Sequence, residues 1–89
     1  MTRVAINSLL HLLDRLGIDA SYSYKYDTIN GKRTRNHQEF TIVISFEESY
    51  LVSCKSNLFN EQKEIKKLKD TKTYIEESFN LFKKLAEKK

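Results

Sequence analysis

Hydrophobic residues recur with a helical period in the first part of the chain. When residues 2–16 are placed on a helical wheel at about 100° per residue, the apolar side chains gather on one arc and most polar side chains lie opposite. The apolar positions are Ala5, Ile6, Leu9, Leu10, Leu12, Leu13 and Leu16. Gly17 follows, and glycine is the usual residue at a left-handed helix end. The pattern predicts an amphipathic helix over residues 2–16.

The period then changes to two, which is typical of strands. Residues 20–28 alternate between aromatic and polar side chains, and residues 40–46 alternate between large apolar and polar ones. Asn30-Gly31 lies between them, and this dipeptide is the strongest short signal of a hairpin turn. Residues 50–55 are rich in strand-forming side chains and predict a third strand. Together these segments predict a three-stranded antiparallel β-meander.

A second helical pattern ends the chain. Residues 74–88 place their apolar side chains on one arc, and Thr73 with Glu76 three residues later predicts a capping box at the start. Residues 58–69 carry only a weak apolar stripe, and this stripe is partly out of phase with the helix that follows. We therefore expect a short extra helix at about residues 60–69, then a break, then the long helix.

The expected fold class is α+β, in the order α-β-β-β-α. An antiparallel sheet needs a cover over its apolar face, and an amphipathic helix needs an apolar surface to pack on. We therefore expect the N-terminal and the C-terminal amphipathic helix to lie on one face of the three-stranded meander. The opposite face of the sheet should be polar and open to solvent.

Two closures of the predicted turn send the first strand's tyrosines to opposite faces, because a slip of one residue inverts a strand. As a two-residue turn, Asn30-Gly31 places the tyrosines in solvent beside Arg35 and His37. As part of a three-residue loop with a glycine bulge, it places them on the core side with Phe40. We favour the second closure, because it gathers the aromatic side chains in one core. The tyrosines are Tyr22, Tyr24 and Tyr26.

Length and composition limit the protein to one small domain. Its 89 residues fit a single domain over residues 1–89, and 39% hydrophobic residues, among them five Phe and five Tyr, are enough for a packed core. Cys54 is the single cysteine, which excludes an internal disulfide and suits a reducing compartment, so we expect a cytoplasmic protein. The first helix carries polar side chains throughout, unlike a signal peptide or a membrane span, so we expect no membrane association.

Residue patterns that carry catalysis or hold cofactors are missing from the sequence. Two glycines in the whole chain exclude a phosphate-binding glycine loop, and the sequence has no paired-histidine metal signature and no nucleophile elbow. His11 and His37 fall at polar positions, and Cys54 falls at an apolar one. We therefore expect a non-enzymatic protein with no catalytic residue, no bound metal, no cofactor and no small-molecule substrate.

Positive charge marks the predicted hairpin. The net charge of +4 comes from lysines near the C-terminus, where lysine often only solvates a helix face. The hairpin adds Lys32, Arg33 and Arg35, with Lys25 across the ladder. Arginine binds phosphate or carboxylate through two parallel hydrogen bonds, and a basic β-hairpin can enter a DNA groove. Under the other register the tyrosines would join Arg35 and His37 as a surface for stacking the bases of single strands or as a hot-spot patch for a protein.

These features predict a small macromolecule-binding module. We expect an inhibitor or adaptor of phage or mobile-element type that acts by protein–protein contact, for example on a host defence nuclease. The alternative is a nucleic-acid-binding regulator, for DNA or RNA, that uses the basic hairpin Lys32–Arg35. The edge strands have few guards beyond Lys25 and Lys55, so the chain is expected to be a monomer or a dimer formed by edge-strand pairing. The candidate binding residues are Lys25, Lys32, Arg33, Arg35, His37, Tyr22, Tyr24 and Tyr26.

Overall fold

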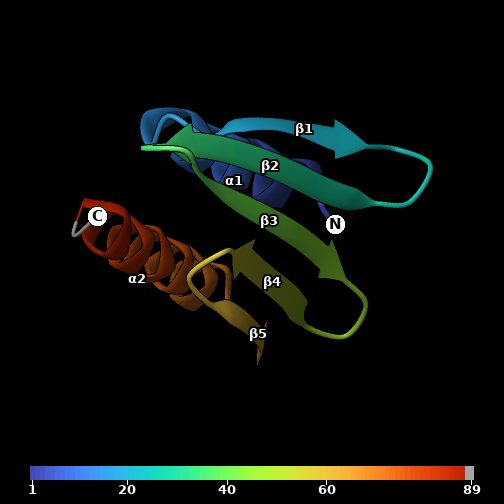
Figure 1. The fold of residues 1–89 in the computed structure, drawn as a ribbon. Helices are drawn as coiled ribbons and strands as arrows, with labels where there is room; N and C mark the ends of the chain where they lie inside the picture. The colour runs from blue at the N-terminus through green and yellow to red at the C-terminus, as the bar shows by residue number, and fades with distance from the viewer. Residues whose placement is uncertain (88–89) are drawn as a thin grey trace.

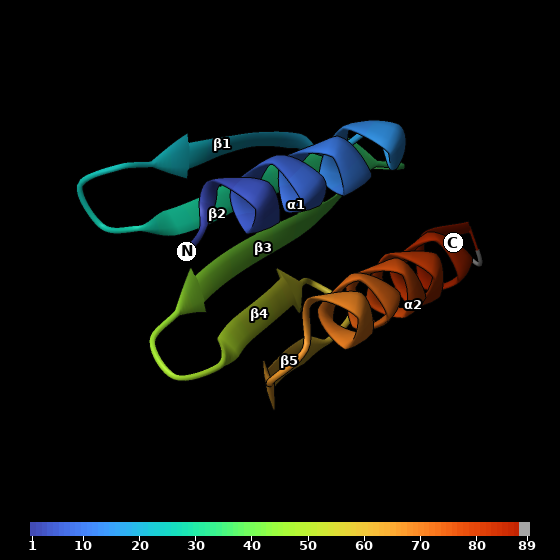
Figure 2. The ribbon, with the colours of Figure 1, turned by 180° about the vertical axis from the view of Figure 1, so that it is seen from behind.

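The computed structural model describes residues 1–87, which form two helices and one five-stranded antiparallel sheet (Figure 1). The elements in chain order are α1 (Arg3–Arg15), β1 (Asp19–Ser23), β2 (Thr28–Arg35), β3 (Gln38–Phe46), β4 (Tyr50–Ser56), β5 (Asn60–Ile65) and α2 (Leu68–Glu87). Each strand pairs with the next one in sequence. Both helices lie on the same face, as the view from behind shows (Figure 2). The α+β class with an antiparallel sheet and two helices is confirmed, whereas the prediction of three strands is wrong.

The Asn30-Gly31 dipeptide is not a turn. Both residues lie in the middle of β2, where Asn30 pairs with Ser21 on one side and Val43 on the other. The chain reverses instead after β1, at residues 24–27, and after β2, at two residues with positive φ. A pair of positive φ values is what a two-residue hairpin of type I′ requires. The two residues are Asn36 (φ 51°) and His37 (φ 64°).

The two extra strands come from segments whose patterns were misassigned. The predicted first strand is in fact β1, a four-residue turn and the start of β2. The predicted short helix at about residues 60–69 is wrong as well, because residues 60–65 form β5 and pair with β4. The second helix begins at Leu68, so Thr73 is not a cap: it lies inside α2 and its hydroxyl donates to the Lys69 carbonyl at 3.2 Å. Lys88, predicted as the helix end, lies outside the described residues.

The first helix forms where its periodicity predicts. Thr2 caps it, since its Oγ1 accepts a hydrogen bond from the Ala5 amide at 3.1 Å. Gly17, with φ +75°, ends it. The buried stripe is Ala5, Leu9, Leu12 and Leu13. This helix packs on β1 and β2, while α2 covers β3, β4 and β5.

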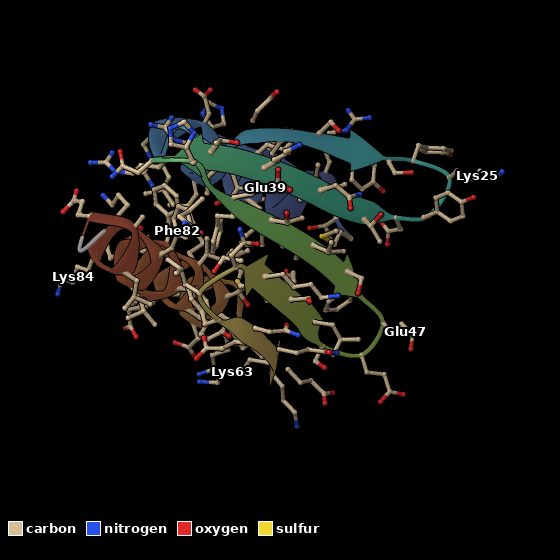
Figure 3. All side chains as sticks on the ribbon, in the orientation of Figure 1. Lys25, Glu39, Glu47, Lys63, Phe82 and Lys84 are labelled. Carbon is tan, nitrogen blue, oxygen red and sulfur yellow. The ribbon has the colours of Figure 1, made fainter. Side chains whose placement is uncertain are left out.

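The core lies between the sheet and the two helices. Phe40 is its centre, with ring centroids of Phe82 at 5.2 Å, Phe79 at 5.4 Å and Phe59 at 6.3 Å. Phe82 is visible between α2 and the sheet in Figure 3. On this face of β3 and β4 the side chains of Ile42, Ile44, Val52 and Cys54 are buried, whereas Phe46 is half-buried. Neither α1 nor α2 is long and apolar enough to cross a membrane.

Candidate functional site

The turn between β1 and β2 carries the most exposed aromatic side chains of the described chain. Tyr24 is 91% exposed and Tyr26 is 69% exposed. Between them Lys25 places its Nζ 5.3 Å from the centroid of the Tyr26 ring. In Figure 3, Lys25 extends from one end of the molecule and Lys84 from the opposite end. We call residues Tyr24, Lys25 and Tyr26 the tyrosine tip.

The predicted core side for the tyrosines is wrong for two of the three. Tyr24 and Tyr26 belong to the turn, so the alternation of β1 does not extend to them. Tyr22 lies in β1, pairs with Ile29 and packs half-buried against the core. The reason is the short β1, which ends at Ser23 and leaves four residues to reverse the chain.

A polar cluster holds the base of the tyrosine tip. Asp27, with φ 50°, accepts hydrogen bonds from the Tyr22 hydroxyl and from the ammonium group of Met1. The Met1 ammonium and, after it, the Tyr22 hydroxyl hold the pKa of the Asp27 carboxyl below its usual value. The bond to Asp27 raises the pKa of Tyr22 in turn. These contacts tie the turn to the segment that precedes α1, so the tip is restrained at its base.

Acid is expected to weaken this restraint. Since the folded pKa of Asp27 is depressed, its carboxylate stabilises the fold above the pKa of an unfolded aspartate, and that contribution is lost as the pH falls through the folded pKa. Asp27→Asn lacks the titrating group, so its unfolding midpoint should depend less on pH than that of the wild type. Thermal unfolding of both proteins from neutral pH to about pH 2 measures the difference. Parallel profiles would contradict the role given to Asp27.

The predicted cations on β2 are held by contacts within the chain. The Nη1 of Arg33 donates to the Gly17 carbonyl at 2.8 Å, beside the end of α1. The Nη2 of Arg35 donates to Glu87 Oε1 at 2.7 Å, at the end of α2. These two guanidinium groups therefore link β2 to the ends of the two helices. Each guanidinium already donates one of its N–H groups to an acceptor within the chain.

The eight predicted binding residues divide into two groups at opposite ends of β2. Tyr22, Tyr24, Lys25 and Tyr26 lie at or beside the turn that leads into β2. Arg33, Arg35 and the exposed His37 lie at its other end, with Lys32, whose Nζ is 3.2 Å from Glu39 Oε2. The structure therefore does not form the single basic patch with interleaved tyrosines.

The face of the sheet away from the helices, which we call the open face, has an uncharged centre. The strand register brings one residue from each strand into a row across all five strands. This central row is Ser21, Asn30, Val43, Ser53 and Gln62. Charged side chains lie in the rows to either side, such as Lys55 towards one end and Glu64 towards the other. The open face is therefore polar overall and uncharged at its middle.

Other reactive or charged groups are used structurally. Burial raises the pKa of the Cys54 thiol to about 11, so the thiol is protonated at neutral pH. The groove between the helices is lined by Arg15, Lys69 and Lys72, and the Nζ of Lys72 donates to the Ser8 hydroxyl at 3.0 Å, which ties α2 to α1. Within residues 1–87, no three His, Cys, Asp or Glu side chains cluster as metal ligands would.

No protein-family model, curated protein or solved structure matches the chain. The function is therefore proposed from the arrangement of its residues.

Proposed function

We propose that the protein is a small non-enzymatic module that binds another protein through the tyrosine tip and the adjoining open face. The observation that carries the proposal is the exposure of Tyr24 and Tyr26 on one restrained turn. Two large rings exposed on the same turn place apolar surface together in water, and exposed apolar surface of this kind often marks an interaction site. Tyrosine is also among the residues that most often dominate binding energy at protein interfaces, because it brings a large apolar ring and a hydroxyl together.

The restraint at the base of the tip favours tight binding. An interface loop that is mobile before binding loses conformational entropy when it docks, at a cost of about 0.5–1.5 kcal/mol for each flexible side chain that is ordered. The contacts of Asp27 with Tyr22 and Met1 hold the turn backbone before any partner arrives. The partner surface that fits such a tip is a hydrophobic pocket with a carboxylate near Lys25.

The role within this class that we favour is an inhibitor or adaptor of phage or mobile-element type, working in the cytoplasm. Compact single-domain size and richness in Lys, Asn, Ile and Tyr support this origin. A host defence nuclease is one example of a target. Nucleic acid is the second candidate partner, since bases can stack on exposed tyrosines flanking a lysine. It is less favoured, because the arginines expected to hold phosphates donate instead to Gly17 and Glu87.

Alanine at both exposed tyrosines is expected to abolish binding without harming the fold. Truncating one hot-spot tyrosine costs about 2 kcal/mol or more, a loss of roughly 30-fold in affinity. The rings of Tyr24 and Tyr26 are exposed, so the free energy of unfolding of the double variant should stay within about 0.5 kcal/mol of wild type. Capture from a host lysate with wild-type and variant baits, followed by binding measurements on the purified partner, tests this.

A matched control separates the two partner classes. Lys84→Ala removes an exposed lysine at the end of the molecule opposite the tyrosine tip (Figure 3) and should leave protein binding unchanged. A nucleic-acid partner would instead disappear from the captured material after nuclease treatment, and its affinity would fall with salt by a log–log slope of about −0.9 per duplex phosphate neutralised. Unchanged capture by the double tyrosine variant would refute the proposed site.

A further inference from the structure

The last strand leaves one side of its backbone free. β5 pairs only with β4 among the described strands, and no described segment runs along its outer side (Figures 1 and 2). All residues from Asn60 to Glu64 are exposed, and none is proline or glycine. Natural edge strands are commonly guarded by proline, bulges, covering segments or charged side chains, especially lysine. β5 has no proline and, among the described residues, no covering segment, and its guards are the charged side chains of Glu61, Lys63 and Glu64. Because these charges have both signs, a second strand with a complementary pattern can still pair with the edge.

The direction of the free groups follows from the β4–β5 hairpin. The Ser56 amide donates to the Phe59 carbonyl at 2.8 Å, which makes these two residues a hydrogen-bonded pair. Hydrogen-bonded pairs alternate along an antiparallel ladder. Glu61 and Lys63 therefore direct their backbone groups towards β4. The amide and carbonyl groups of the residues between and beside them point out to solvent, and these residues are Asn60, Gln62 and Glu64.

We propose that a second copy of this chain pairs with β5, antiparallel, about a two-fold axis that passes midway between Gln62 and Gln62 of the second copy. In such a pairing the helices of both copies lie on the same side, and residues directly opposite each other share a face. With Gln62 opposite Gln62 of the second copy, Glu61 faces Lys63 of the second copy and Lys63 faces Glu61. Asn60 faces Glu64 in the same way. The two sheets then form one continuous ten-stranded sheet.

Charge selects this register over its neighbours. The smallest slide that keeps facing residues on the same face is two residues. Sliding the second copy by two residues puts Glu61 opposite Glu61 in one direction and Lys63 opposite Lys63 in the other. Opposite charges facing each other across strands are favourable and like charges are not. In the proposed register both Glu61–Lys63 pairs are complementary, no like charges face each other, and about six backbone hydrogen bonds form. β1, at the other edge, carries Asp19 as its one charged side chain, so no such pattern selects a register there.

Tyr74 contacts the side chains of both Glu61 and Lys63. Its hydroxyl donates to Glu61 Oε2 at 3.3 Å, and the Nζ of Lys63 lies 5.3 Å from its ring centroid. Both charged side chains are therefore held on the helix side of β5, where the pairs between copies would form. Lys63 is seen at the lower border of the sheet in Figure 3.

The same axis would cover an exposed apolar side chain. Glu61, Lys63 and Tyr74 line a hollow on the helix side of β5 together with Leu81 of α2, which is 40% exposed. Because the axis passes between the two Gln62 residues, the pairing brings the hollows of the two copies to either side of it. Burial of Leu81 adds an apolar contribution to the backbone hydrogen bonds.

Charge reversal with mixing tests the pairing. The full chain is studied by analytical ultracentrifugation as wild type, E61K, K63E and the double variant E61K/K63E. The wild type should dimerise with concentration. Each single variant should raise the dimer Kd about tenfold or more, because both symmetric contacts become repulsive. The double variant should restore the dimer, and an equal mixture of E61K and K63E should form a mixed dimer, since all facing charges are then opposite.

Controls make each outcome decisive. Glu48→Lys changes charge by the same amount as E61K at an exposed turn and should leave the dimer intact. Gln62→Pro removes an amide that points outward, so it should keep the β4–β5 pairing and abolish the dimer. A wild type that stays monomeric, a dimer that tolerates the single reversals, or single variants that fail to pair with each other would overturn the proposal. Tyr24→Ala with Tyr26→Ala should leave the dimer unchanged. The test of the dimer interface is therefore independent of the test of the tyrosine tip.

Discussion

Alanine in place of Phe40 is expected to lower the free energy of unfolding by about 3–5 kcal/mol. The side chain is fully buried, and its ring contacts the rings of Phe59, Phe79 and Phe82. It thus joins β3 to the β4–β5 turn and to two turns of α2, and truncation would leave a cavity at the point where these elements meet. A domain of this size has a total stability of roughly 5–10 kcal/mol, so the variant should retain only a small margin.

Chemical denaturation followed by circular dichroism measures this loss. Phe40→Leu keeps most of the volume and should cost less than half as much as the alanine variant. Val4→Ala, at a 75% exposed position of α1, should change the midpoint little. An alanine variant as stable as the leucine one would mean that the four rings do not form the centre of the core.

The parts of the fold that were predicted from the sequence are those in which burial repeats strictly. The leucines of α1 recur every third or fourth position, and β3 alternates Phe40, Ile42 and Ile44 with polar residues. In each case one face of the element is buried along most of its length, so hydrophobic residues recur at the period of that face and the element can be predicted from them.

The strand β5 was missed because its pattern is almost absent. Of its six residues only Ile65 is buried, and the other five are polar and exposed at the sheet edge. An edge strand held by backbone hydrogen bonds needs no alternation of hydrophobic side chains. A polar run of this kind is therefore indistinguishable by period from a solvated helix or a loop.

The candidate site was predicted in its residues but not in its arrangement. Tyr24, Lys25 and Tyr26 were picked out, yet their alternation with Ser23 and Asp27 imitates a strand. The signal that distinguishes a turn here is Asp27, since aspartate tolerates positive φ and accepts local hydrogen bonds. Its partner Tyr22 is near in sequence, but its contact with Met1 joins distant residues and depends on how α1 packs.

Asn30-Gly31 misled the prediction because its glycine is required for packing. Gly31 lies on the helix side of β2, and a Cβ built there would come 2.8 Å from the Ile18 Cγ2 and 2.9 Å from the Ile42 Cγ2. Glycine is thus needed for close approach rather than for a turn. The actual turn of the next hairpin uses Asn36-His37, two residue types enriched at positive φ among non-glycine residues.

Valine at Gly31 is therefore expected to destabilise the protein by about 3 kcal/mol, near the upper end of the usual range for overpacking. The matched change Asn30→Val, one residue earlier, falls on the open face of β2 and should be neutral or slightly stabilising, because valine suits a strand. Asn36→Val should cost about 1–2 kcal/mol, because a β-branched residue must then adopt positive φ. Thermal or denaturant unfolding of the three variants gives all three values.

The order of these effects decides between the two positions for the turn. If Asn30-Gly31 closed the hairpin as a two-residue turn, Asn30 would need positive φ and Asn30→Val would be strongly destabilising. If it closed as a three-residue loop, only Gly31 would need positive φ. In both cases Asn36 would lie in a strand, so Asn36→Val would be harmless. With Asn30 inside β2, the reverse holds. The sheet register depends on this position, and the register in turn places Tyr24 and Tyr26 in the turn and Gln62 at the end of the uncharged central row. A harmless Asn30→Val beside a costly Asn36→Val would thus support both binding surfaces through the fold that positions them.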